Sequence, residues 1–107
     1  MPDVFQPETM KIALIGYRNH AETLIKFCLS HTAVKSIIIY HPDSGKLKCI
    51  NDRWPDERCS ATSEIEVLFG VDAVLISAPG KYHYDYIKTL VDHVPAIFCE
   101  KPPVVNV

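Results

Sequence analysis

The 107-residue sequence lacks the features that would place it in a membrane or on a nucleic acid. No apolar run approaches the roughly 18 residues that a membrane-spanning helix needs. Residues 1–10 lack the basic-then-apolar pattern of a secretory signal. The net charge of −2 offers no basic excess for a phosphate backbone or an anionic lipid surface. We therefore expect neither nucleic acid nor membrane as a partner.

The cysteines are too scattered for a disulfide-stapled scaffold or a zinc site. They form no C-x-x-C pair and show no metal-ligand spacing: Cys28, Cys49, Cys59 and Cys99. Cysteines among apolar residues pack as small hydrophobes, and unpaired thiols are typical of a reducing compartment. The sequence therefore predicts no metal site and a cytoplasmic location.

What the sequence does contain is an alternation of short β-rich runs with helical patterns. Hydrophobic residues make up 48% and charged residues 22%, the balance of an ordinary globular domain. We expect residues 1–10 to form a frayed tail and residues 11–107 to form a single domain. The alternation indicates an α/β fold with a parallel sheet.

Apolar runs rich in β-branched residues predict strands, and apolar positions three and four residues apart predict helices. The strands are expected at 11–16, 34–40, 72–78 and 95–99, and the helices at 20–30, 63–69 and 81–93. Ser63 and Glu66 have the spacing of a capping box, and Gly70 suits a left-handed helix end. Residues 46–61 receive no assignment, because 46–51 fits a short helix and an edge strand equally.

Right-handed crossovers would wind these elements into a doubly wound parallel sheet of the Rossmann type, with about five strands. In such sheets ligands bind beyond the carboxyl ends of the strands. Those ends are expected at four places: residues 16–18, 40–41, 78–80 and 100–101. Every candidate site residue lies at or just beyond one of them.

The first of these places carries an altered dinucleotide fingerprint. The usual pattern after the first strand is G-x-G-x-x-G or G-x-G-x-x-A, and residues 16–21 read G-Y-R-N-H-A. Gly16 and Ala21 match, but Arg18 replaces the middle glycine, which normally lets the backbone approach the pyrophosphate. The Arg18 side chain either obstructs the phosphate or offers it a charge-assisted contact.

The second place lacks the acidic residue that usually binds the ribose hydroxyls of NAD. His41 stands at that position, and Asp43 follows beyond a proline. The sequence therefore does not support a preference for NAD over NADP. Lys46 and Lys48 are near enough in sequence to meet a 2′-phosphate, although lysines in a loop are more often simply solvated.

The carboxyl-terminal third carries more specific motifs. Residues 72–79 read D-A-V-L-I-S-A-P, His83 follows, and residues 99–102 read C-E-K-P. This pattern closely resembles the amino-terminal domain of the Gfo/Idh/MocA family of NAD(P)-dependent oxidoreductases. The resemblance covers roughly residues 10–107, and the Glu100-Lys101-Pro102 match is its most diagnostic part.

The resemblance implies roles for particular residues. Lys101 would be the catalytic residue that polarises or protonates the substrate oxygen, since an ammonium beside a carbonyl stabilises the alkoxide formed during hydride transfer. The hydride chemistry itself belongs to the cofactor, NAD or NADP. The expected cofactor-binding residues follow the strand ends: Gly16, Tyr17, Arg18, Asn19, His41, Ala78, Pro79, His83 and Glu100.

The family's carboxyl-terminal substrate domain has no counterpart in these 107 residues. We expect a fragment of a longer enzyme rather than a free-standing remnant. It would be inactive in isolation, and would meet a sugar, polyol or related hydroxyl compound only together with the missing domain. A sheet face exposed by that absence would favour homo-oligomers.

Two other functions are compatible with the residues. Arg18 and His41 favour a non-catalytic Rossmann module that binds another nucleotide or a protein partner, whereas Lys101 argues against it. A second alternative, weaker than the first, is a protein that modifies nucleotide sugars.

Overall fold

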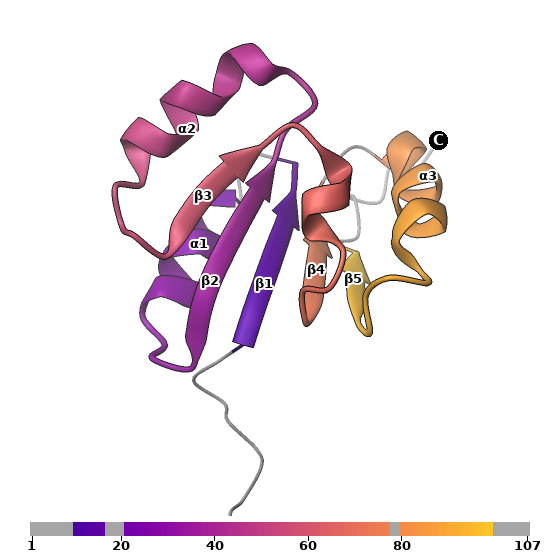
Figure 1. The fold of residues 1–107 in the computed structure, drawn as a ribbon, viewed down its shortest axis with the longest axis horizontal. Helices are drawn as coiled ribbons and strands as arrows, with labels where there is room; N and C mark the ends of the chain where they lie inside the picture. Colours follow the sequence, from indigo (N-terminus) through magenta and orange to yellow (C-terminus); the bar gives the residue numbers. More distant parts are fainter. Residues whose placement is uncertain (1–9, 17–20, 78–79, 100–107) are drawn as a thin grey trace, which may run out of the picture.

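The structure is a computed structural model that describes residues 10–16, 21–77 and 80–99, the side chains of residues 80–83 excepted. Five parallel strands form one sheet in the order β3-β2-β1-β4-β5 (Figure 1). The strands are β1 (Met10–Ile15), β2 (Val34–Tyr40), β3 (Cys59–Thr62), β4 (Ala73–Ile76) and β5 (Ile97–Cys99). The predicted doubly wound parallel sheet is thereby confirmed.

The connections between the strands are helical. They contain α1 (Ala21–Leu29), the 3₁₀ turn η2 (Ser44–Lys46), α2 (Leu47–Arg53), the 3₁₀ turn η3 (Ile65–Leu68) and α3 (Gly80–Leu90). The chain moves from β1 outward to β3, then crosses to β4 and continues to β5. This reversal of direction puts α1 and α2 on one face of the sheet and η3 and α3 on the other.

Side-chain alternation along the strands divides the core into two clusters. On β1, Leu14 packs with α1 and α2, whereas Ala13 and Ile15 pack with η3 and α3. Ile37 and Ile39 of β2 lie in the same cluster as Leu14, on the face covered by α1 and α2, which we call the α1 cluster. Because successive strand residues point to opposite faces, apolar runs such as these are what a sheet covered on both faces requires.

The unassigned segment 46–61 contains both α2 and β3. The helical alternative for residues 46–51 is the correct one. Only Ile50 of α2 is buried, and Trp54, directly after the helix, packs beside it in the α1 cluster. The edge strand β3 has the sequence C-S-A-T, which carries little strand signal. It forms because its backbone pairs with that of β2 from Ile37 onward.

The predicted capping box at Ser63 is wrong. The segment forms the 3₁₀ turn η3, whose N-cap is Glu64 and makes no side-chain capping bond. Instead, the Glu64 N–H donates to Thr62 Oγ1 at 3.1 Å. The side chain that accepts a backbone N–H here is therefore that of Thr62 and not that of Ser63. Gly70 has a φ of +93°, as its predicted left-handed role requires.

Candidate functional site

The carboxyl ends of the strands lie at one edge of the sheet. Ile15 of β1 pairs with Tyr40 of β2 on one side and with Ile76 of β4 on the other. The pairing of Ile76 with Cys99 extends this alignment to β5. The backbone after each strand therefore emerges at the same edge, where sequence analysis places all the candidate residues.

The turn after β1 begins with a glycine in the left-handed region. Gly16 has a φ of +96°, a conformation that residues with a side chain rarely adopt. The Ser77 N–H donates to Ile15 O at 2.7 Å, which joins the ends of β1 and β4 beside this turn. Ala21, the first residue of α1, is fully buried, so its small side chain lets the helix start close to the sheet.

The turn after β2 is held by hydrogen bonds on both sides. The His41 N–H donates to Thr62 O at 2.9 Å, which ties the turn to the end of β3. The Asp43 N–H donates to His41 Nδ1 at 3.0 Å, so Nδ1 is an acceptor. Asp43 Oδ1 in turn accepts from the Gly45 N–H at 2.9 Å and caps η2.

Asp43 is thus a residue of this edge that the predicted site omitted. The signal was present in the sequence, because Asp followed two residues later by Gly is typical of a turn in which the carboxylate accepts a backbone N–H. Asp43 is absent from the predicted site because it does not directly follow the strand.

A hollow of about 260 Å³ opens between α1 and the ends of β4 and β5. Its lining is mostly apolar with two hydroxyls and a thiol: Thr23, Leu24, Leu75, Ile76, Ser77, Phe98 and Cys99. Complete ligand pockets usually measure about 300–1,000 Å³, so the hollow suits one ring of a larger ligand rather than the whole of it. Sequence analysis did not identify Phe98 or Thr23 as candidates.

On the face of the sheet that α3 covers, aromatic side chains pack at the carboxyl edge. The Tyr40 ring contacts that of Tyr86 on α3 edge-on, with ring centres 6.0 Å apart. Burial, and secondly the negative charge of Glu66, raises the pKa of Tyr40. The phenol therefore remains protonated at neutral pH.

Two basic side chains on α2 are engaged with carboxylates. Arg53 donates to both oxygens of Glu22 at 3.2 Å, and its guanidinium lies 4.4 Å from the Trp54 ring centre. Lys48 Nζ lies 2.9 Å from Asp52 Oδ2, and this hydrogen bond raises the pKa of Lys48. The Lys48 side chain is solvated, as sequence analysis favoured.

Most of the predicted site residues lie outside the described part of the chain. These are Tyr17, Arg18, Asn19, Ala78, Pro79, Glu100 and Lys101, together with the side chain of His83. Of the predicted residues, the structure brings together Gly16 and His41. Among the described residues, no group of three or more His, Cys, Asp or Glu side chains is placed to hold a metal ion. No helix in the described ranges has the length and hydropathy to cross a membrane.

The described residues fit a dinucleotide. The left-handed Gly16 allows a tight turn into α1, whose N-terminal N–H groups suit a pyrophosphate. On one side of that turn lies the hydrogen-bonded His41 turn, and on the other the apolar hollow. A doubly wound sheet with these features is a dinucleotide-binding domain of the Rossmann type.

Comparison with known proteins places this domain in a family. The sequence profile of the Gfo/Idh/MocA oxidoreductase family, described as having an NAD-binding Rossmann fold, matches residues 10–107. The chain belongs to this family and is its NAD(P)-binding domain, with NAD or NADP as the cofactor. No curated protein matches the chain by sequence.

A solved structure shares the fold. The crystal structure of a predicted NADPH-dependent oxidoreductase from Desulfitobacterium hafniense DCB-2 superposes with a TM-score of 0.74 at 22% identity. The match covers 92% of this chain and 28% of that chain. The present sequence therefore spans less than a third of the length of that protein.

Proposed function

We propose that this chain is the nucleotide-binding part of an oxidoreductase that acts on a CH–OH carbon of a sugar, polyol or related compound. The observation that carries the proposal is the left-handed turn at Gly16 in a chain of this oxidoreductase family. We expect the chain on its own to bind the cofactor without turning over substrate.

Each part of the cofactor has a place at the carboxyl edge. The pyrophosphate lies at the Gly16 turn, with contacts from Tyr17, Arg18 and Asn19. The adenosine end lies at the turn that begins with His41. The nicotinamide end lies in the hollow that Phe98 lines, near Ala78, Pro79, His83 and Glu100. The bound nicotinamide supplies or accepts the hydride.

Lys101 is the proposed catalytic residue. It follows Cys99, the last residue of β5, by two positions in the sequence, and Cys99 lines the hollow. Its ammonium would hold and protonate the oxygen of the reacting carbon. In a longer protein containing this domain, Lys101→Met would lower kcat and leave NADH affinity unchanged.

The direct test is a titration of the chain with NADH and NADPH, followed by nicotinamide fluorescence. We expect at least one to bind with a dissociation constant in the micromolar-to-millimolar range. If neither binds at millimolar concentration, the proposal is wrong and a non-catalytic module becomes the better interpretation. In the same assay Arg18→Ala is expected to weaken binding. Tighter binding by that variant would mean that the side chain obstructs the phosphate.

A second test locates the nicotinamide end. Phe98 lines the hollow and is 57% exposed, so Phe98→Ala should leave the core intact. We expect weaker binding of NADH and unchanged binding of ADP-ribose, which has no nicotinamide. The matched control is Phe27→Ala, because Phe27 is 63% exposed on α1 but does not line the hollow. Equal loss of affinity for both ligands would place the nicotinamide elsewhere.

We also propose that the protein works in a reducing cytoplasm. All the cysteines are free. Burial raises the pKa of the Cys28 and Cys59 thiols, which keeps them protonated and unreactive.

A further inference from the structure

The turn that follows β2 differs from the usual dinucleotide site in a way that bears on the choice of cofactor. NAD and NADP differ only at the 2′ position of the adenosine ribose, which meets this turn in a Rossmann domain. We infer that Asp43 is the specificity-determining residue of the site and that the domain selects NAD(H) over NADP(H). The inference rests on the proposed function.

Asp43 is held in place before any ligand arrives. Its N–H donates to His41 Nδ1 at 3.0 Å, and its Oδ1 accepts from the Gly45 N–H at 2.9 Å. A carboxylate has about four acceptor sites, so one hydrogen bond to Oδ1 leaves acceptors for the two ribose hydroxyls. The residue is exposed, so these acceptors are open to a ligand. Asp43 can therefore replace the carboxylate that His41 displaces from its usual position.

His41 is engaged within the turn itself. Because Nδ1 accepts the Asp43 N–H at 3.0 Å, that ring nitrogen is not presented to a ligand. The carboxylate of Asp43 is therefore the group of this turn that is placed to meet the ribose hydroxyls.

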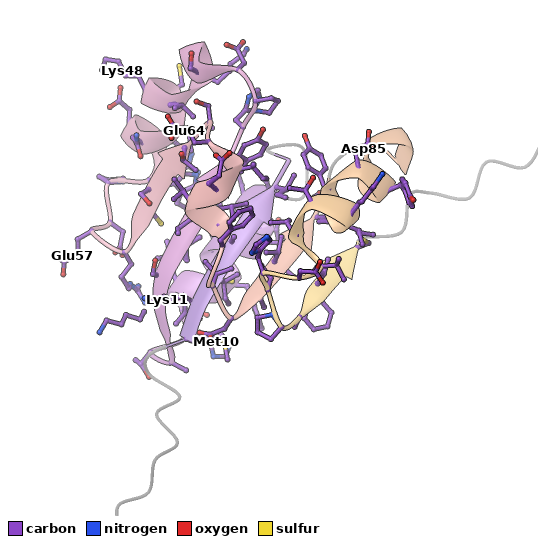
Figure 2. The ribbon with its side chains drawn as sticks, turned by 45° about the vertical axis from the view of Figure 1, so that its right-hand side comes forward. Met10, Lys11, Lys48, Glu57, Glu64 and Asp85 are labelled. Atoms are coloured by element: carbon purple, nitrogen blue, oxygen red, sulfur yellow. The ribbon has the colours of Figure 1, made fainter. Side chains whose placement is uncertain are left out.

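The basic residues of α2 are engaged with carboxylates. Glu64 and Glu66 follow β3, next to β2 in the sheet, and Figure 2 shows Glu64 at the same end of the molecule as Lys48. Lys48 is already bound to Asp52, and Arg53 is bound to Glu22. The basic residue nearest to Asp43 in sequence is Lys46, which is exposed.

The charge balance therefore favours a ligand with hydroxyls. A 2′-phosphate brings about two negative charges toward Asp43, and juxtaposed like charges cost affinity. A 2′-hydroxyl instead donates to the same carboxylate. The solved relative from Desulfitobacterium hafniense is named for NADPH, so the inference distinguishes this chain from a protein that shares its fold.

The experiment measures the dissociation constants of NADH and NADPH for three proteins: the unchanged chain, Asp43→Asn and Glu57→Gln. The asparagine keeps an oxygen for the Gly45 N–H but removes the charge. Glu57→Gln removes the same charge before β3, nearer to the end of the sheet where Lys11 lies (Figure 2). We expect the unchanged chain and Glu57→Gln to bind NADH at least about tenfold more tightly than NADPH. In Asp43→Asn the two affinities should become similar.

Added salt provides a test that does not depend on a variant. Screening weakens repulsion between Asp43 and the 2′-phosphate, so the preference for NADH should decrease as ionic strength rises. If NADPH binds as tightly as NADH, or if Asp43→Asn keeps the full preference, the inference is wrong while the proposed function stands. If neither dinucleotide binds to the unchanged chain, the proposed function itself fails.

Discussion

Arg58 connects the segment before β3 to the connection between α1 and β2, which is distant in sequence. Its guanidinium donates to Leu29 O at 2.9 Å and to Val34 O at 3.2 Å. The first carbonyl belongs to the last residue of α1 and the second to the first residue of β2. Asp56 holds the guanidinium from the other side at 3.3 Å. Arg58 thus supplies partners for carbonyls at the amino end of the sheet.

We predict that Arg58→Ala destabilises the fold by about 2 kcal/mol, because hydrogen bonds from a charged donor are lost and partly buried carbonyls lose their partners. The free energy of unfolding would be measured by urea denaturation with circular dichroism. The control is Lys35→Ala, an exposed residue of β2, which should change stability by less than about 0.5 kcal/mol. Equal losses in the two variants would contradict the proposed role of Arg58.

Asp56 should give part of this stability a dependence on pH. Hydrogen bonds from Arg58 hold the pKa of Asp56 below its ordinary value of 3.8. A carboxyl group whose pKa is lowered by folding stabilises the protein above its unfolded pKa, and this contribution is lost as the pH falls through the folded pKa. Asp56→Asn should therefore unfold less steeply with acid than the unchanged chain, as measured by urea midpoints from neutral pH to below 3.8. Parallel acid profiles would show that the pair contributes nothing.

Sequence analysis could not identify this role of Arg58. The carbonyls that it contacts lie 29 and 24 residues away, and nothing local in the sequence indicates which distant backbone groups a guanidinium will reach. The left-handed conformation of Gly70, by contrast, is predicted correctly, and Gly16 has the same conformation at the first position of the fingerprint. A left-handed turn residue is selected by local sterics, which are visible in the sequence itself.

These two glycines allow a matched test of the turn between β1 and α1. Gly16 and Gly70 have nearly the same φ, +96° and +93°, so a Cβ atom strains both by roughly 1–2 kcal/mol. No atom lies within 4 Å of a Cβ built at Gly70, so Gly70→Ala adds no clash to that strain. Both Gly16→Ala and Gly70→Ala should lower stability, and only Gly16→Ala should also weaken NADH binding.

The measurement combines urea denaturation with the nicotinamide fluorescence titration for each variant. Gly70 lies between η3 and the start of β4, and its N–H donates to His93 O. It is therefore near the amino end of β4, whereas the site lies at the carboxyl ends of the strands. Unchanged NADH affinity in a folded Gly16→Ala protein would separate the turn from cofactor binding. Equal weakening in both variants would mean that affinity simply follows stability.

At the level of elements, the sequence predicted most reliably where burial is two-sided. The runs that became β1, β2 and β4 are nearly continuously apolar because helices cover both faces of the sheet. β3 was missed because an edge strand with small side chains is specified by its partner's backbone. The sequence does not decide the helix α2, because Ile50 is its only buried residue and one buried residue gives no periodicity.

The candidate site shows the same division. Gly16 was predictable because the fingerprint is local, whereas the hollow lined by Thr23 and Phe98 was not. The hollow exists only when α1 is packed on the sheet and β5 is paired beside β4 at the edge of the sheet. Which side chains then line the space depends on packing among three elements, and no motif encodes that.

For the whole molecule, the site is a path across the sheet rather than a single pocket. The His41 turn lies after β2, the Gly16 turn after the central strand, and the hollow at β4 and β5. A ligand that spans this path contacts elements from both halves of the domain, one on each side of the point where the strand order reverses. Binding should therefore stabilise the entire fold and not one turn.

This predicts a large thermal shift for the complete dinucleotide and smaller shifts for its parts. A ligand at 100 times its dissociation constant adds about 2.7 kcal/mol of stability. For a domain of this size that corresponds to a rise in Tm of about 10 °C. At the same concentrations, AMP and nicotinamide mononucleotide should each produce less, because each reaches only one end of the path. If AMP alone reproduced the full shift of NADH, the hollow at β4 and β5 would not belong to the cofactor site.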